Sequence, residues 1–336
     1  MKKLLYIGNN LSNGNKTPTT VETLGKLLVL EGFTVKTASS KSNKFLRLLD
    51  MLKAVILLKK EVDYVLIDTY STSNFYYAYL VSQLCRVLRL KYIPILHGGN
   101  LQKRLKYSPK LSKALFNNAF KNVTPSEYLK AQFQDFDYHN LEVIPNTIEL
   151  KNYTFKNRIF DIPKLLWVRS FAEIYNPLLA VEILKILKAE HIEASLCMVG
   201  PEKDGSLKLA KQFAEELGVE VKFTGKLSKK EWIKLSEDYN IFINTTNFDN
   251  MPVSVIEAMA LGLQVISTNV GGMPFLIKNK EEGILVEPNN AVLLAKSITH
   301  MVLKRFDTKA MTINARKKVE QFDWNIVKEK WITLLS

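Results

Sequence analysis

The chain has 336 residues, of which 47% are hydrophobic and 24% are charged, a composition typical of a folded soluble protein. Since a single hydrophobic core rarely grows beyond about 250–300 residues, this length favours two domains. No apolar run reaches the roughly 20 residues that span a bilayer, and the apolar stretch of "MKKLLYIGNN" is too short for a secretory signal.

The positive charge is concentrated in the first half of the chain. Residues 1–160 contain 24 Lys and Arg against 11 Asp and Glu, a net charge of +13, whereas residues 161–336 contain 23 against 22, a net charge of +1. This asymmetry indicates a nucleic acid or an anionic membrane face as a partner, or else a lysine-rich solvated surface. Cys85 and Cys197 are expected to be small buried hydrophobes, as fits a reducing cytoplasm.

Strand-like and helix-like segments alternate along the first half. Helix-length segments at 21–30, 45–58 and 74–88 separate the first of the β-branched runs, which lie at 3–8, 34–39, 64–69, 91–96, 121–126 and 141–146. Such alternation predicts a parallel sheet covered by helices on both faces.

The same pattern restarts after residue 160. Further strand-like runs lie at 164–169, 194–200, 219–225, 240–245, 263–268 and 283–287, and three helices are expected to close the chain, the last at 322–335. The aperiodic segment 152–163 reads as the linker. We therefore predict an α/β protein with two Rossmann-like domains, whose ligands bind at the carboxyl ends of the strands in the cleft between them.

Two candidate sites follow strands of the first domain. Gly8 and Gly14, in "GNNLSNGNKTPTT", allow a tight turn and the close approach of a ligand, although an ordinary strand–helix connection explains them equally well. His97, in "PILHGG", is placed to donate a hydrogen bond to a substrate hydroxyl, or alternatively caps a turn as a structural residue.

A basic cluster follows shortly after His97. Ser108-Pro109 is expected to be the N-cap and first position of a helix inside it. The cluster predicts contact with phosphate, on a lipid-linked substrate or on bilayer headgroups, or else it is a solvated face. Its members are Lys103, Arg104, Lys106, Lys110 and Lys113.

Arg169 and Gly200 end two strands of the second domain. An arginine at that position can bind a phosphate through a forked pair of hydrogen bonds, or it forms an ordinary surface ion pair. Gly200, followed by Pro201, permits the close approach of a ligand.

The stretch "FDNMPVSVIEAMALG", residues 248–262, sets two carboxylates around a predicted helix start. Pro252 suits the first helical turn, and the unpaired amides just beyond it can hold a diphosphate. Glu257 and Asp249 can then accept sugar hydroxyls. The alternative is a capping box of Ser254 and Glu257, with Asp249 as a simple cap.

These residues together resemble glycosyltransferase family 4, retaining enzymes with two Rossmann-like domains (the GT-B fold). The family signature, an acidic residue and seven others before a glutamate that opens "EAMA.G.PVI", corresponds to "DNMPVSVIEAMALGLQVISTNVGGMPFLI". Further similar segments follow in the family order: "LHGG" (96–99), "TPSEYLK" (124–130), "VIPNTIE" (143–149), "WVRSF" (167–171), "MVGP" (198–201), "FTGKLSKKE" (223–231) and "EGILVEP" (282–288).

The resemblance implies a role for each matching position. Glu257 would bind the nucleotide ribose, Asp249 and His97 the transferred sugar, and Arg169 the diphosphate. Asn250, Met251 and Pro252 would also meet the sugar, while Val253 and Ser254 would meet the diphosphate, with no metal and no cofactor required.

Two positions depart from the family pattern. Asp249 is one methylene shorter than the usual Glu, and Ile174 and Tyr175 stand where the family usually has a phosphate-binding lysine. Lys203 or Lys226 is the candidate substitute. Without one, loss of a charged hydrogen bond of about 1.5–3 kcal/mol would slow or abolish turnover.

The sequence therefore predicts an acceptor-binding domain at 1–155, a nucleotide-sugar-binding domain at 156–321, and a C-terminal helix at 322–336 that returns to the first domain. The expected function is transfer of a sugar from a nucleotide-sugar donor to a glycan or lipid-linked acceptor for cell-surface polysaccharide, at the cytoplasmic face of the membrane. A nucleotide-sugar epimerase and a non-catalytic nucleotide-sugar or glycan-binding protein are the alternatives. Nucleic-acid binding ranks behind them, because no nucleic-acid motif is present.

Overall fold

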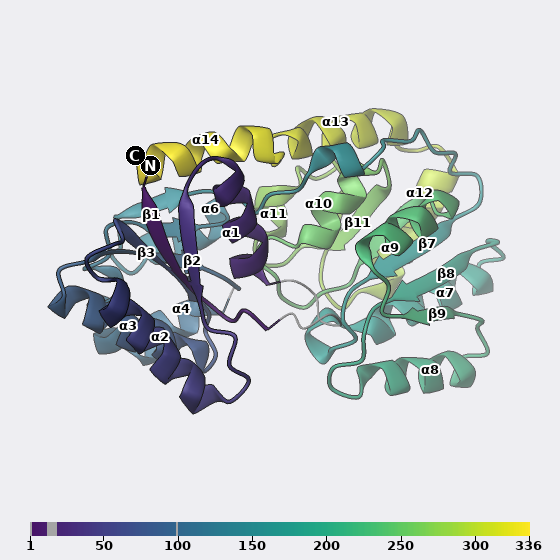
Figure 1. Cartoon of the computed structure of the whole chain (residues 1–336). Coiled ribbons are helices and arrows are strands. Elements are labelled where there is room, and N and C mark those ends of the chain that lie inside the picture. The colour runs from purple at the N-terminus through teal and green to yellow at the C-terminus, as the bar shows by residue number, and fades with distance from the viewer. Residues whose placement is uncertain (1, 12–18, 99) are drawn as a thin grey trace. The chain divides into compact units, whose positions relative to one another are not determined.

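The computed structural model describes residues 2–11, 19–98 and 100–336, and the chain divides into two compact units. Unit 1 comprises Met1–Pro145 and Asn325–Ser336, and unit 2 comprises Asn146–Trp324. Both are α/β units built on a parallel sheet, as the alternating pattern predicts (Figure 1).

The described part of unit 1 contains a six-stranded sheet in the order β2-β1-β3-β4-β5-β6. Its strands pair in parallel throughout, so the chain between two successive strands must cross a face of the sheet as a helix or loop. The strands are β1 (Lys3–Ile7), β2 (Thr34–Ala38), β3 (Tyr64–Thr69), β4 (Lys91–Leu96), β5 (Asn122–Thr124) and β6 (Leu141–Val143).

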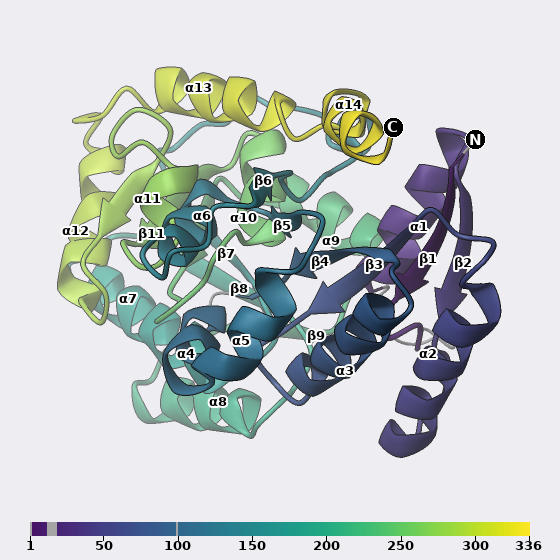
Figure 2. The same ribbon diagram turned by 90° about the vertical axis from the view of Figure 1, so that its left-hand side faces the viewer.

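Helices α1, α2, α3 and α6 of unit 1 pack against this sheet, whereas α4 and α5 pack against neighbouring helices. Figure 2 shows α2 and α3 side by side at the outer edge of the unit, and the two helices are in contact. The helices are α1 (Thr20–Leu30), α2 (Lys44–Leu58), α3 (Asn74–Val87), α4 (Leu101–Tyr107), α5 (Pro109–Phe116), α6 (Glu127–Gln134) and α14 (Trp324–Leu335).

The C-terminal helix α14 belongs to unit 1 from Asn325 onward. Its Lys328 Nζ lies 3.3 Å from Glu31 Oε2, and Lys330 Nζ donates to the carbonyl of Val143 at 3.1 Å. Trp331 is buried. The last turns of the chain therefore complete the packing of the first domain.

Unit 2 contains the second six-stranded sheet, in the order β12-β11-β10-β7-β8-β9, as far as the structure describes it. Its strands are β7 (Lys164–Val168), β8 (Ser195–Val199), β9 (Lys222–Gly225), β10 (Ile241–Asn244), β11 (Gln264–Thr268) and β12 (Ile284–Val286). Its helices are α7 (Pro177–Ala189), α8 (Ser206–Glu216), α9 (Lys229–Leu235), α10 (Val253–Ala260), α11 (Met273–Leu276), α12 (Ala291–Val302) and α13 (Thr308–Glu320), with short 3-10 turns η1 (Leu150–Asn152), η2 (Glu173–Tyr175) and η3 (Ser236–Asp238).

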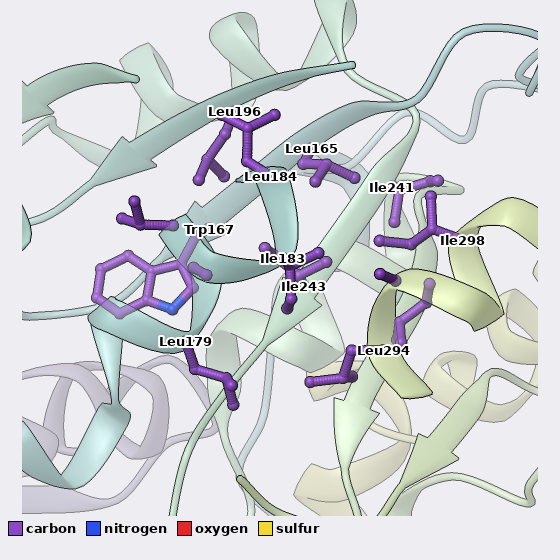
Figure 3. Close-up of a cluster of buried hydrophobic side chains, with 14 of the residues drawn as sticks. Leu165, Trp167, Leu179, Ile183, Leu184, Leu196, Ile241, Ile243, Leu294 and Ile298 are labelled. Carbon is purple, nitrogen blue, oxygen red and sulfur yellow. The ribbon is translucent and has the colours of Figure 1, made fainter. Parts of the chain in front are cut away.

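Alternation along β7 builds two cores in unit 2. Leu165 and Trp167 face the helices α7, α8 and α12, whereas Leu166 faces α9, α10 and α13. Figure 3 shows the first of these cores, where side chains of α7 and α12 meet those of β7, β8 and β10. Both faces are apolar, which explains why the strands read as nearly continuous hydrophobic runs.

The division between the units falls at residues 145 and 146, whereas the sequence suggested 155. Ile148 and Tyr153 are buried in the second core of unit 2, and the amide of Ile148 donates to the carbonyl of Phe322 at 3.0 Å. The suggested linker is held to the same unit by Arg158, which donates to the carbonyls of Ser236 (2.9 Å) and Leu261 (3.1 Å). These contacts explain why residues 146–163 go with unit 2.

Candidate nucleotide-sugar site

The acidic stretch lies at the carboxyl end of the buried strand β10. Beyond this strand, residues 245–252 form a loop, and helix α10 begins at Val253 with Pro252 as its N-cap. Pro252 therefore stands one position before the helix rather than in its first turn, where the sequence analysis placed it. Its ring still fixes the entry angle and contributes no amide hydrogen.

Two glycines, Gly271 and Gly272, pack against the backbone of this loop. The amide of Gly272 donates to the carbonyl of Asp249 at 3.0 Å. A Cβ on Gly272 would lie 1.7 Å from the oxygen of Asn250, and one on Gly271 would lie 2.0 Å from the oxygen of Asp249. The "GG" of the "NVGGMP" segment is thus required because the backbone of the loop packs directly against it.

The first amides of α10 are unpaired. The amide of Val255 bonds back to the carbonyl of Pro252, but the amides of Val253 and Ser254 have no hydrogen-bond acceptor within the described residues. The hydroxyl of Ser254 is also buried without a partner. Three donors at the positive end of a helix form a site for an anion of the size of a phosphate.

Glu257 lies one turn into α10 and is 4% exposed. Its Oε1 accepts a hydrogen bond from the hydroxyl of Tyr153 at 2.6 Å and lies 2.6 Å from Lys229 Nζ. Burial and the Glu257 carboxylate raise the pKa of Tyr153 well above its usual value, so this hydroxyl remains a donor. The oxygen Oε2 has no hydrogen bond to any described residue, which leaves one acceptor of the carboxylate open.

These contacts exclude the capping-box alternative. Glu257 bonds to Tyr153 and Lys229 instead of an N-cap amide, and the Ser254 hydroxyl is unbonded. Asp249 does not cap the helix either, because its Oδ1 accepts from the adjacent amide of Asn250 at 2.8 Å. Both carboxylates are therefore held near the helix start by contacts that do not involve capping.

Arg169 and Asp249 bind each other. The guanidinium of Arg169, at the end of β7, pairs through Nη2 with Asp249 Oδ2, and its Nε lies 3.4 Å from Asn244 Oδ1. The ring of Tyr175 stacks on the guanidinium, with 4.6 Å between Cζ and the ring centroid. The aromatic ring thus occupies the position of the expected lysine and holds the arginine that remains, whose Nη1 has no acceptor in the described residues.

Gly200 serves the packing of two strand ends. With φ of +155°, it brings β8 so close to β7 that a Cβ would lie 1.6 Å from the carbonyl oxygen of Arg169. The space predicted for a ligand is thus filled by the backbone that carries Arg169.

The two candidate replacement lysines are exposed at the ends of neighbouring strands. The amide of Lys203 donates to Glu202 Oε1 at 2.6 Å, and within the described chain no hydrogen bond or ion pair joins its side chain to Arg169. Lys226 follows β9 directly. Neither residue is tied to the arginine by an observed contact, so their role as phosphate ligands stays a prediction.

Sequence analysis missed the partners of Glu257. Tyr153 lies in the suggested linker, 104 positions away, and Lys229 opens α9 behind a capping box of Ser228 and Glu231. The only local signals were an aromatic residue in a polar segment and a lysine at a helix start. Neither of these signals identifies a distant carboxylate.

His97 in unit 1 is half-buried and forms a dyad with the buried Asp68. Its Nε2 lies 2.7 Å from Asp68 Oδ1, which also accepts from the hydroxyl of Tyr6 at 2.9 Å, and the ring stacks on Tyr70 with 4.7 Å between centroids. Because a carboxylate only accepts, Nε2 carries the hydrogen and the neutral ring presents an acceptor at Nδ1. The sequence analysis expected His97 to donate a hydrogen bond to a substrate hydroxyl. The free nitrogen Nδ1 can donate only when the ring is charged.

Gly8, from the glycine-containing loop, approaches the same carboxylate. A Cβ at this position would lie 2.6 Å from Asp68 Oδ2, so a side chain would displace the dyad. Gly14 lies outside the described residues.

The basic cluster at 103–113 is only partly available to a partner. Arg104 donates to the carbonyl of Ser71 at 2.7 Å, and its guanidinium lies 5.2 Å from the rings of both Phe75 and Tyr76. It is a structural residue, because its donors and its charge are used within unit 1. The other four members are exposed: Lys103, Lys106, Lys110 and Lys113.

Two further findings concern metals and membranes. Over residues 2–11, 19–98 and 100–336, no three His, Cys, Asp or Glu side chains gather closely enough to hold a metal ion. In the same ranges, no helix combines the length and the apolar character that a membrane span requires. Cys85 and Cys197 are both buried and unpaired, as expected.

The two parallel six-stranded units define the GT-B class of glycosyltransferase folds. A sucrose-phosphate synthase from Thermosynechococcus elongatus superposes with a TM-score of 0.79 at 18% identity, covering 99% of this chain and 98% of that chain. The Anabaena protein HepE, in complex with UDP-glucose, superposes with a TM-score of 0.76 at 17% identity over 99% of each chain.

The family follows from the sequence of unit 2. Residues 151–318 match the model of glycosyl transferases group 1, and the chain belongs to this family. Among curated relatives, the putative colanic acid biosynthesis glycosyltransferase WcaL of Salmonella typhimurium is 24% identical over 267 residues, covering 74% of this chain and 65% of the relative. A sulfoquinovosyl transferase of Arabidopsis thaliana is 26% identical over 156 residues, 45% of this chain and 29% of the relative, so the chain spans less than two thirds of either protein.

Proposed function

We propose that this chain is a retaining glycosyltransferase that moves a sugar from a nucleotide-sugar donor to a glycan or lipid-linked acceptor in cell-surface polysaccharide synthesis. The observation that carries the proposal is the start of α10, where the unpaired amides of Val253 and Ser254 lie one turn from the open oxygen of Glu257. Relatives named for colanic acid and amylovoran biosynthesis support the polysaccharide role.

Hydrogen-bond donors would hold one part of the nucleotide sugar, and a carboxylate acceptor would hold the other. Its diphosphate would bind the α10 amides and the open Nη1 of Arg169, while its ribose hydroxyls would donate to Oε2 of Glu257. The complexes of HepE with UDP and with UDP-glucose support a nucleotide-sugar ligand for this fold.

Donor binding would also rearrange the Arg169–Asp249 pair. A diphosphate carries more charge than one carboxylate, so it would compete for the guanidinium and release Asp249 to accept a hydroxyl of the transferred sugar. The contact of Tyr175 with Arg169 would keep the guanidinium in place during this exchange.

The transfer would proceed on one face of the sugar. The bond from the anomeric carbon to the phosphate oxygen breaks, the bond to the acceptor oxygen forms on the same side, and the leaving phosphate takes the acceptor proton. Because Arg169 and the helix start supply the positive potential at the leaving group, the proposal includes no metal.

Thermal shift with UDP-, GDP- and ADP-sugars identifies the donor class, since a ligand at 100 times its Kd adds about 2.7 kcal/mol of stability. Release of the nucleoside diphosphate and the anomeric configuration of the product, followed by NMR in the presence of EDTA, then test transfer, retention and the absence of a metal. A changed sugar on an intact nucleotide would identify an epimerase, and binding without turnover would identify a binding protein.

Two variants connect the assay to the site. Arg169→Ala should reduce turnover about ten-fold or more, because it removes a charged contact of at least about 1.4 kcal/mol. The matched control is Glu216→Gln on α8, an exposed carboxylate that should leave turnover unchanged. Full activity in the arginine variant would contradict its assignment to the diphosphate.

A further inference from the structure

The outer face of helix α2 carries an apolar stripe. Its members are Phe45 (68% exposed), Leu46 (54%), Leu49 (47%), Ile56 (49%) and Leu57 (64%). At 3.6 residues per turn these side chains fall within roughly 120° of the helix circumference. Single exposed hydrophobic residues are common on a protein surface, but five along one side of one helix indicate a contact surface.

The helix that carries this stripe is firmly attached to unit 1. Its opposite face buries Arg47, Met51 and Val55. Arg47 donates to the carbonyls of Lys41 and Ser42, both at 2.7 Å, which fixes the start of the helix. The exposed stripe therefore belongs to a helix whose position is fixed by its other face.

The charges around the stripe identify the partner. Lys53 lies within the apolar arc and is exposed, and residues 41–60 contain five exposed lysines against a single acidic side chain, Asp50. Lysine is depleted in the cores of protein–protein interfaces. On a helix that lies in a membrane interface, lysines instead extend to the lipid phosphates while their apolar neighbours enter the acyl region.

We propose that α2 docks unit 1 onto an anionic lipid bilayer. The stripe of residues 45–57 enters the headgroup–acyl boundary, and Lys41, Lys53 and the terminal pair Lys59 and Lys60 contact lipid phosphates. This assigns the membrane surface to α2 in place of the 103–113 cluster. The inference does not rest on the proposed glycosyl transfer, because vesicles without donor or acceptor test it.

The test is flotation of the full chain with vesicles of phosphatidylcholine, alone and with about 30% phosphatidylglycerol. The double variant Leu49→Glu, Ile56→Glu should weaken partitioning into the anionic vesicles about ten-fold or more for each substitution, since each removes the burial of one large apolar side chain. The matched control, Leu209→Glu with Val292→Glu, changes residues of similar exposure (54% and 62%) on α8 and α12 of unit 2 and should bind like the parent.

A third variant separates the two candidate surfaces of unit 1. Replacement of the four exposed lysines of the 103–113 cluster by Gln should leave most of the anionic-vesicle binding intact. Circular dichroism and urea unfolding of each variant confirm that the fold is retained. The proposal is overturned if the parent does not float, if the α2 variant floats like the parent, or if only the lysine variant loses binding.

Discussion

The two oxygens of Glu257 allow the candidate site to be tested separately from the stability of the fold. Tyr153 and Lys229 both converge on Oε1, whereas Oε2 is open. In Glu257→Gln, the amide oxygen must take the place of Oε1, because both neighbours are donors. The NH₂ group then occupies the position of Oε2 and presents donors where ribose hydroxyls would need an acceptor.

The expected loss of nucleotide affinity in Glu257→Gln follows from the loss of a hydrogen bond to a charged carboxylate. A hydrogen bond to a charged group contributes about 1.5–3 kcal/mol, so the Kd for the preferred nucleoside diphosphate should rise roughly ten- to hundred-fold. The free energy of unfolding should change much less, since the side chain keeps its shape and Lys229 is largely exposed.

Tyr153→Phe is the matched variant, because it removes a donor to Oε1 and leaves Oε2 untouched. It should lower the free energy of unfolding by about 1–3 kcal/mol, since the buried Oε1 loses a short hydrogen bond. Nucleotide affinity should change by less than roughly three-fold, or about 0.6 kcal/mol. Isothermal titration calorimetry and urea unfolding measure the two quantities. Equal losses of affinity in both variants, or unchanged affinity in the Gln variant, would refute the assignment of Oε2 to ribose.

Three further predictions concern other parts of the two units. Nitrogen-15 NMR above neutral pH should find the hydrogen of His97 on Nε2, and Asp68→Asn should shift it toward Nδ1; an Nδ1–H form in the parent would contradict the dyad. Gly200→Ala should destabilise the chain by about 3 kcal/mol or more in urea, because its Cβ overlaps the Arg169 carbonyl, and a cost below about 1 kcal/mol would show that the strand ends can separate. Tyr175→Lys should lower the melting temperature of the free protein, because the added positive charge repels Arg169. It should tighten nucleoside diphosphate binding about ten-fold, because a bound phosphate lies between the two cations. Weaker binding would show that the aromatic ring matters more to the site than a second charge.

The fold could be predicted almost completely from the sequence, because its signals are local. Each β-branched run that was expected to be a strand overlaps one of the observed strands, and the helices predicted at 21–30, 45–58 and 74–88 agree with α1, α2 and α3 to within a residue at either end. Strand ends were less accurate. The run at 219–225, for example, forms a strand only from Lys222, where pairing with β8 begins.

The helix start at the candidate site could be predicted from the sequence, but the contacts of its side chains could not. The helix start at Val253 follows from Pro252 and the apolar run behind it. That Asp249 pairs with Arg169, and Glu257 with Tyr153, depends on residues 80 and 104 positions apart. Spacing along a sequence carries no information about such pairs, because only the packed sheet brings them together.

Charge counting along the sequence favoured a different surface from the one that we propose for lipid. Residues 103–113 look basic in sequence, yet the guanidinium of Arg104 donates a hydrogen bond to the carbonyl of Ser71 within unit 1. The stripe on α2 was visible in principle, since "FLRLLDMLKAVILL" is apolar on more of its circumference than one buried face requires. Composition averages over this pattern, whereas a helical projection of the same residues separates the buried side from the exposed one.

The return of the chain in α14 has a consequence for biosynthesis. Val327, Trp331 and Leu335 are buried on a helix that belongs to unit 1, yet the ribosome adds them only after all of unit 2 has been made. Early domains normally finish folding while the rest of the polypeptide is still being translated. Here the amino-terminal domain must wait, with an apolar surface uncovered, until its last helix emerges from the exit tunnel.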